Sequence, residues 1–224
     1  MNRDARVPAP VRALARAVAV SLTMATAGCA GAPKGFHLDA TMAPPEGLRP
    51  EQYARAARHY EELCDGGNAR GCGYLAFMYD NGHGVPQDLE DALELSENAC
   101  SDGIAYGCAY LGYMLHLGRG CRAEPTRAAE LFDRACDLGD PSGCLLLGVM
   151  YHAGTGVPYD PRRAVSLFRA ACEGNDSAGC ASLGFMYRYG QGVPTEPHTA
   201  QALFRRACDA GNRMGCRELR GGLD

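Results

Sequence analysis

The residues with the most distinctive chemistry are cysteines, which recur in pairs at a fixed spacing. The chain has 224 residues and twelve cysteines, and ten of these form five Cys-x7-Cys pairs. Successive pairs are 36 residues apart without deviation, and a fixed period of this length is the sequence signature of a repeat array. The pairs are Cys64 with Cys72, Cys100 with Cys108, Cys136 with Cys144, Cys172 with Cys180, and Cys208 with Cys216.

Disulfide formation within such a pair requires the chain to reverse direction between its two cysteines. On one continuous helix the two residues would lie about 12 Å apart, whereas a disulfide needs Cα atoms roughly 4.4–6.8 Å apart. Gly103, Gly139 and Gly211 lie between paired cysteines and can adopt the left-handed conformation that ends a helix. Asp140 follows as an N-cap for the next helix. The spacing therefore predicts five disulfides, each across a tight helix–turn–helix.

The elements that position these cysteines are two alternating types of helix. The B helix ends at the first cysteine of a pair, as in residues 51–64, EQYARAARHYEELC, which have an amphipathic pattern. The A helix begins at the second cysteine with Gly-Cys-x-x-Leu-[Ala/Gly]-x-Met and closes on Gly-x-Gly. Every later B helix opens with an acid that we expect to act as its N-cap. These acids are Asp88, Glu124, Asp160 and Glu196. The pattern predicts an all-α solenoid over residues 51–224, with four full repeats plus end helices.

The N-terminal segment is typical of export. A basic stretch precedes a short apolar run at residues 17–27, which is too short to span a bilayer permanently and indicates a secretory signal. The run ends in Thr26-Ala27-Gly28-Cys29, which resembles a bacterial lipobox, although Thr26 stands where Leu, Val or Ile is usual. We expect a lipoprotein-type signal peptide at residues 1–28 and a lipid on Cys29. The alternative is ordinary cleavage nearby, which would leave a secreted protein.

Residues 29–50 are rich in Ala, Pro and Gly, and they predict a flexible tether with a reach of roughly 25 Å. The tether would hold the folded body close to a membrane surface. The expected location is therefore the cell envelope, with the protein lipid-anchored and facing the periplasm or the exterior. Abundant cysteines in a regular pattern suit an oxidising compartment of this kind.

Motifs that would support catalysis or metal binding are missing from the sequence. The sole lysine, Lys34, has Gly31 three residues before it, so the Ser-x-x-Lys motif of serine β-lactamases is impossible. His116 and His152 share one repeat position, but two ligands do not make a metal site. We expect no metal and no cofactor, and the net charge of −4 gives no indication of a nucleic-acid partner. Cys121 stands where other repeats have valine, so we expect a buried small side chain, with a redox or intermolecular role as the alternative.

The repeated LGxMYxxGxGVxxD…A…LF…A pattern over about residues 51–220 resembles the Sel1-like repeat, a relative of the tetratricopeptide repeat. The regular cysteine pairs resemble more closely the bacterial cysteine-rich Hcp family. This resemblance implies a right-handed superhelix of helical hairpins with one disulfide per hairpin. It also implies two functions: an adaptor that binds proteins or peptides, or a penicillin-binding protein with slow β-lactamase activity towards a β-lactam.

One stripe along the A helices varies in residue type and is rich in Tyr and Phe. It consists of positions 70, 74, 77 and 81 and their equivalents in later repeats, opposite the face that carries the fixed core residues. Four such stripes side by side would line the concave face of a solenoid, where exposed aromatic residues suit partner binding. The alternative is that the stripe packs between neighbouring A helices. The predicted partner-binding residues are Tyr74, Phe77, Tyr106, Tyr110, Tyr113 and Tyr189, of which Tyr74, Tyr106, Tyr110 and Tyr189 are expected to be exposed.

Overall fold

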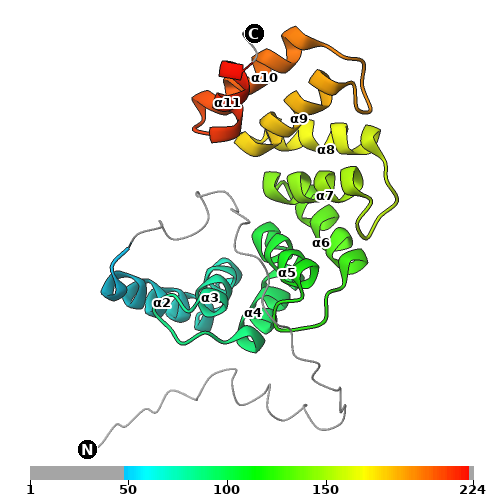
Figure 1. The fold of residues 1–224 in the computed structure, drawn as a ribbon. Coiled ribbons are helices and arrows are strands. Elements are labelled where there is room, and N and C mark those ends of the chain that lie inside the picture. Colours follow the sequence, from blue (N-terminus) through cyan, green and yellow to red (C-terminus); the bar gives the residue numbers. More distant parts are fainter. Residues whose placement is uncertain (1–47, 222–224) are drawn as a thin grey trace, which may run out of the picture.

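The protein is described by a computed structural model that covers residues 48–221, so the predicted signal peptide, Cys29 and most of the tether lie outside the described residues. The described chain forms ten α-helices and no strand, which confirms the all-α prediction (Figure 1). None of these helices is long and apolar enough to span a membrane. The B helices are α2 (Pro50–Asp65), α4 (Leu89–Ser101), α6 (Pro125–Asp137), α8 (Pro161–Glu173) and α10 (Pro197–Asp209). The A helices are α3 (Ala69–Asn81), α5 (Ala105–Leu117), α7 (Pro141–Ala153), α9 (Ser177–Tyr189) and α11 (Arg213–Gly221).

The helices stack in chain order into a curved solenoid, shown in Figure 1. Each helix packs against the next one, and each A helix also packs against the A helix of the following repeat. Within residues 48–221 no B helix packs against another B helix in this way. Because the A helices approach one another more closely than the B helices do, the array bends with the A helices on its inner side. The A helices therefore form the concave layer.

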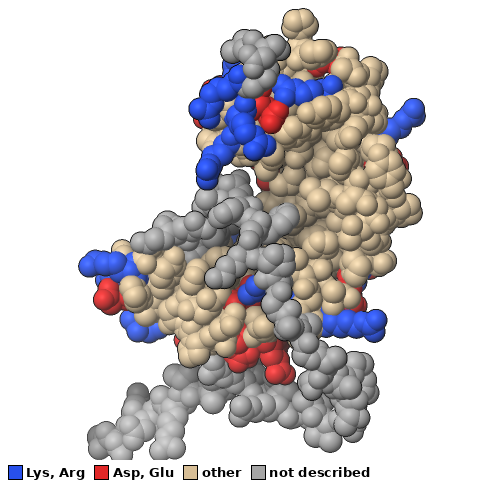
Figure 2. Space-filling view, viewed as in Figure 1, with Lys and Arg blue, Asp and Glu red and all other residues tan. Residues whose placement is uncertain are grey.

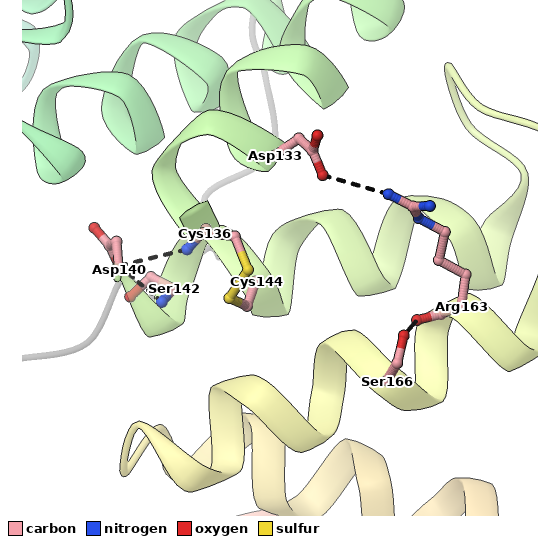
Figure 3. The surroundings of a disulfide bond; sticks show 8 residues. Asp133, Cys136, Asp140, Ser142, Cys144, Arg163 and Ser166 are labelled. Carbon is pink, nitrogen blue, oxygen red and sulfur yellow. Dashed lines mark hydrogen bonds and ion pairs between the residues drawn. A yellow bond between two sulfur atoms is a disulfide. The ribbon is translucent and has the colours of Figure 1, made fainter. Parts of the chain in front are cut away.

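All five predicted disulfides are present across the turns between a B helix and the next A helix. Their Cα–Cα distances are 4.4–4.6 Å. Figure 3 shows the surroundings of the disulfide between Cys136 and Cys144. Gly139, in the turn between these cysteines, has the predicted left-handed backbone with a φ of 87°. The Asp140 carboxylate then accepts hydrogen bonds from the backbone N–H groups of Ser142 and Gly143, so it caps α7 as predicted. The disulfide between Cys136 and Cys144 thus spans a turn that the backbone already favours.

Close approach of the two helices in each hairpin requires small residues beside the disulfide. A Cβ atom added to Gly107 would lie 2.6 Å from the Cβ of Ala99, closer than such atoms can approach. The same glycine–alanine contact recurs at Gly143, Gly179 and Gly215, where the distances to the alanine Cβ are 2.6–2.7 Å. The glycine before the second cysteine is therefore required for the two disulfide-linked helices to pack this closely.

A second volume match joins each A helix to the B helix that follows it. A Cβ atom on Gly148 would lie 2.7 Å from the Phe168 ring, and Gly112 and Gly184 face Phe132 and Phe204 in the same way. In the first described repeat, Ala76 replaces the glycine and Ser96 replaces the phenylalanine, and both are fully buried. The methyl group that Ala76 adds is thus compensated by the smaller side chain of Ser96, which keeps the interface close-packed.

The predicted N-caps of the later B helices are correct for aspartate and wrong for glutamate. Asp88 and Asp160 each accept hydrogen bonds from two backbone N–H groups of the following helix. Glu124 and Glu196 make no side-chain cap. The glutamate side chain is one methylene longer, and the Glu196 carboxylate instead accepts a hydrogen bond from the Thr199 hydroxyl, 2.8 Å away.

Removing one staple should destabilise the hairpin without abolishing the fold. For Cys136→Ala/Cys144→Ala we expect the free energy of unfolding to fall by about 2–3 kcal/mol, because the unfolded chain loses a short covalent loop. Urea denaturation followed by circular dichroism measures the change. Unaltered stability, or non-reducing peptide mapping that joins Cys136 to another cysteine, would show that the staple is assigned wrongly.

Candidate functional site

The candidate site is the concave stripe, defined as positions 70, 74, 77 and 81 of α3 and their equivalents on α5, α7, α9 and α11. The structure divides it into two halves with opposite properties. On α3 and α5 the large side chains pack against one another. On α7, α9 and α11 several of them are exposed to solvent, although Leu146 on α7 is buried.

In the N-terminal half, tyrosines interlock between neighbouring A helices. The Tyr74 ring centroid lies 5.4 Å from that of Tyr106, and the Tyr106 centroid lies 5.7 Å from that of Tyr110. Tyr106 is 7% exposed and Tyr110 only 1%. The prediction that these two residues are exposed is therefore wrong, because they fill the interface between α3, α5 and the neighbouring turn. Tyr74 and Phe77 are half-buried, as is Tyr113.

A buried polar network explains how Tyr110 can lie so deep. Its hydroxyl donates a hydrogen bond to Asp80 Oδ2 at 2.6 Å, and Arg119 Nε donates to Asp80 Oδ1 at 2.7 Å. Asp80 is 1% exposed, so these donors satisfy a carboxylate that would otherwise be costly to bury. Burial raises the pKa of Tyr110 well above its usual value, and the adjacent Asp80 charge raises it further. The network joins the first two described repeats.

In the C-terminal half, small residues replace most of the tyrosines that fill the N-terminal half, and the exception is buried Leu146 at the repeat position of Tyr110 on α7. Ser142 and Ala178 stand at the repeat position of Tyr106, and Ser182 stands at that of Tyr110. As a consequence, larger stripe residues nearby stay uncovered. The C-terminal concave surface is defined here by Val149 (40% exposed), half-buried Phe185, Tyr189 (62% exposed) and Met214 (40% exposed).

Tyr189 is thus exposed as predicted, and its ring stacks on Phe185 with the centroids 6.2 Å apart. Val149 and Met214 were missing from the predicted set. The sequence did contain a signal for them. Both residues occupy stripe positions, and the A helix between them carries small residues at two stripe positions, Ala178 and Ser182.

An ion pair holds the last A helix against this surface. Arg188 on α9 donates to the Glu218 carboxylate on α11, and its guanidinium lies over the Phe204 ring, 4.6 Å from the centroid. Arg188 stands at the repeat position of Asp80, and Glu218 stands at that of Tyr110. The same pair of positions therefore links neighbouring repeats at both ends of the array, by a hydrogen bond between Tyr110 and Asp80 at one end and by an ion pair at the other.

The histidines and Cys121 form no evident reactive centre in the described part of the chain. No group of three or more His, Cys, Asp or Glu side chains is placed to hold a metal ion there. His152 Nε2 hydrogen-bonds to Gln191 Oε1 at 2.7 Å, and burial lowers the pKa of His116. Cys121 is half-buried against the core between α5 and α6.

Comparison with known proteins agrees with this architecture. The sequence profile of the Sel1 repeat matches residues 46–68, 69–104, 105–140, 141–176 and 177–212. No protein of curated function matches the chain significantly.

Three solved structures are similar to this chain. A Sel1 repeat protein from Oxalobacter formigenes is 31% identical, with a TM-score of 0.67 over 77% of this chain and 49% of that chain. The protective antigen c5321 of uropathogenic Escherichia coli is 26% identical, with a TM-score of 0.67 over 75% of this chain and 36% of that chain. Cysteine-rich protein B of Helicobacter pylori is 29% identical, with a TM-score of 0.49 over 58% of this chain and 94% of that chain. The chain spans about half the length of the first of these proteins and about a third of the second.

The two halves of the stripe should respond differently to truncation. Tyr110→Ala should lower the free energy of unfolding by about 3–5 kcal/mol, as for other buried aromatic side chains, and it also removes the hydrogen-bond donor to Asp80 Oδ2. Tyr189→Ala should change it by no more than about 0.5 kcal/mol, because the side chain is exposed. Urea denaturation of the oxidised protein measures both. Equal losses for the two variants would contradict the division of the stripe.

Proposed function

The chain belongs to the Sel1 repeat family, and on that premise we propose that it is an exported scaffold whose C-terminal concave surface binds a protein or peptide partner. Sel1 repeat proteins generally act through protein partners. The single observation that carries the proposal is the exposure of apolar side chains on α7, α9 and α11, on the inner side of a curved array.

The chemistry of this surface suits protein recognition. Tyrosine and methionine are enriched in the cores of protein interfaces, where rigid aromatic side chains bury a large area at low entropic cost. The supporting layer is firmly held, since disulfides staple α7 to α6 and α9 to α8, and the Arg188–Glu218 ion pair fixes α11. A preorganised surface loses little conformational freedom on binding.

The disulfides support the proposal of export. Five disulfides in a chain of this size suit an oxidising, extracytoplasmic compartment. Within the proposal, residues 1–28 direct secretion, Cys29 carries the lipid, and residues 29–50 tether the solenoid to the membrane. The β-lactamase alternative rests on the family resemblance alone, because no motif in the sequence supplies a nucleophile for it.

A photocrosslinker placed in the surface tests partner binding directly. Replacing Tyr189 by p-benzoylphenylalanine in the producing cells should give discrete crosslinked adducts in the envelope fraction. The matched control is Tyr159, which is 61% exposed but lies in the loop before α8, outside the concave stripe. Adducts from both positions in equal yield, or from neither, would count against a specific partner on this surface.

Once that partner is identified, Tyr189→Ala should weaken its binding by about 2 kcal/mol, the scale of an interface hot spot. Tyr159→Ala should leave binding unchanged. Titration of the purified partner measures both affinities.

The lipid anchor has its own test. Cys29→Ser should release the protein from membranes while leaving its thermal unfolding unchanged, because the proposed tether contributes nothing to the core. Membrane flotation of wild-type and variant protein checks this. A variant that stays wholly membrane-bound after a high-salt wash would refute the anchor.

A further inference from the structure

We propose that α11 presents a second, electrostatic binding face that takes an extended acidic peptide segment of a partner protein. This terminal arginine face consists of Arg213, Arg217 and Arg220, with Met214 beside them. This face is distinct from the C-terminal concave surface, because the three arginines do not occupy stripe positions.

The terminal arginine face is open because no described helix covers it. The A helices α3, α5, α7 and α9 each pack extensively against the B helix that follows, whereas α11 packs only against α9 and α10 within residues 48–221. An open hollow of about 620 Å³ remains there, lined by Gly211, Arg213, Met214, Cys216, Arg217 and Arg220.

The residue types argue against another copy of the repeat as the occupant. Arg220 stands at the repeat position of Gly112, Gly148 and Gly184. At those glycines even a Cβ atom would lie 2.7–2.8 Å from the phenylalanine ring of the following B helix. Arginine at this position therefore prevents the packing by which one hairpin normally covers the next. A ligand with different chemistry is needed to fill the hollow.

The positive charge of the face is largely uncompensated. The Arg213 side chain forms no hydrogen bond or ion pair within the described residues, and Arg220 Nε donates only to the Cys216 carbonyl at 3.4 Å. Arg217 lies 3.5 Å from Glu218, but that carboxylate already accepts from Arg188. Figure 2 shows the resulting group of basic side chains over the C-terminal end of the solenoid. Like charges four residues apart on a helix repel one another, and a bound anion would relieve that repulsion.

The spacing of the arginines fits carboxylates on an extended chain. Residues four apart on a helix are about 6 Å apart along its axis, and alternate side chains of an extended strand are roughly 6.6 Å apart. Guanidinium groups bind carboxylates in a bidentate manner. We therefore expect acidic residues at alternate positions of the segment, because alternate side chains lie on the same face of an extended strand and can reach the arginines together. A hollow of this kind suits a peptide better than the flat surface of a bilayer.

The test is fluorescence anisotropy with the full-length oxidised protein and a labelled peptide in which glutamate alternates with leucine. The same peptide with glutamine in place of glutamate is the control ligand. We expect the acidic peptide to bind at least about tenfold more tightly, since paired charges dominate this face. Binding should weaken as NaCl is raised from about 0.05 M to about 0.5 M, because salt screens exposed charges.

Variants locate the interaction. Arg213→Gln/Arg217→Gln should weaken binding of the acidic peptide about tenfold, whereas Arg213→Lys/Arg217→Lys should retain part of it. The matched control is Arg162→Gln/Arg205→Gln, which removes the same charge from exposed positions on α8 and α10. Thermal melts confirm that all variants fold, which the Cys208–Cys216 disulfide at the start of α11 favours.

Four outcomes would overturn the inference. These are equal binding of the glutamine peptide, an equal loss in the control variant, and binding of phosphatidylglycerol vesicles but not peptide through Arg213 and Arg217. The fourth is self-association of the protein that Arg213→Gln/Arg217→Gln abolishes, because a second copy would then occupy the face. None of these results alters crosslinking from position 189, so the proposed function stands or fails separately.

Discussion

The structure depends on one constraint, the close approach of two helices across each stapled turn. A Cα–Cα distance of 4.4–4.6 Å leaves no room for a Cβ atom at the position before the second cysteine, so this residue is always glycine, and it faces alanine in four hairpins and Leu63 in the first. The turn itself needs a left-handed residue, which is glycine or Asn175. Because every repeat meets the same constraint, every hairpin has the same geometry, and identical hairpins stack into a regular array.

Regular stacking makes the spaces between neighbouring A helices equivalent, and the residues that fill them decide the function of each part. Between α3 and α5 the space is filled by tyrosines and closed by the Asp80–Arg119 pair. On α9, Ala178 and Ser182 take the places of the tyrosines, and Val149 and Tyr189 remain exposed. In the function we propose, the N-terminal half is the support and the exposed C-terminal half is the surface that binds a partner.

Much of the fold could be predicted because it is determined by local and periodic features. The turns, the disulfides and the aspartate caps depend on residues within one hairpin. The cysteine pairs that mark these hairpins recur five times at intervals of 36 residues. The burial of Tyr106 and Tyr110 could not be read from the same pattern. Repeat position determines which side of a helix a residue occupies, but not how far a neighbouring repeat reaches across it.

The decisive contacts for Tyr110 come from Asp80, 30 residues away, while Asp80 is in turn held by Arg119, 39 residues away. The sequence did contain a signal, since Asp80 is the only acid at its repeat position in α3, α5, α7 and α9, and Arg119 is the only arginine at its own. That these two side chains are in contact is visible only once the repeats are stacked. The glutamate caps failed for a smaller reason, which is the length of one methylene group.

The central claim is that the concave stripe is closed in its N-terminal half and open in its C-terminal half. Hydroxyl-radical footprinting of the oxidised full-length protein, read by mass spectrometry, tests it without a partner or a mutation. We predict rapid modification of Tyr189 and Met214 and strong protection of Tyr106 and Tyr110. Modification of Tyr110 as fast as that of Tyr189 would contradict the account.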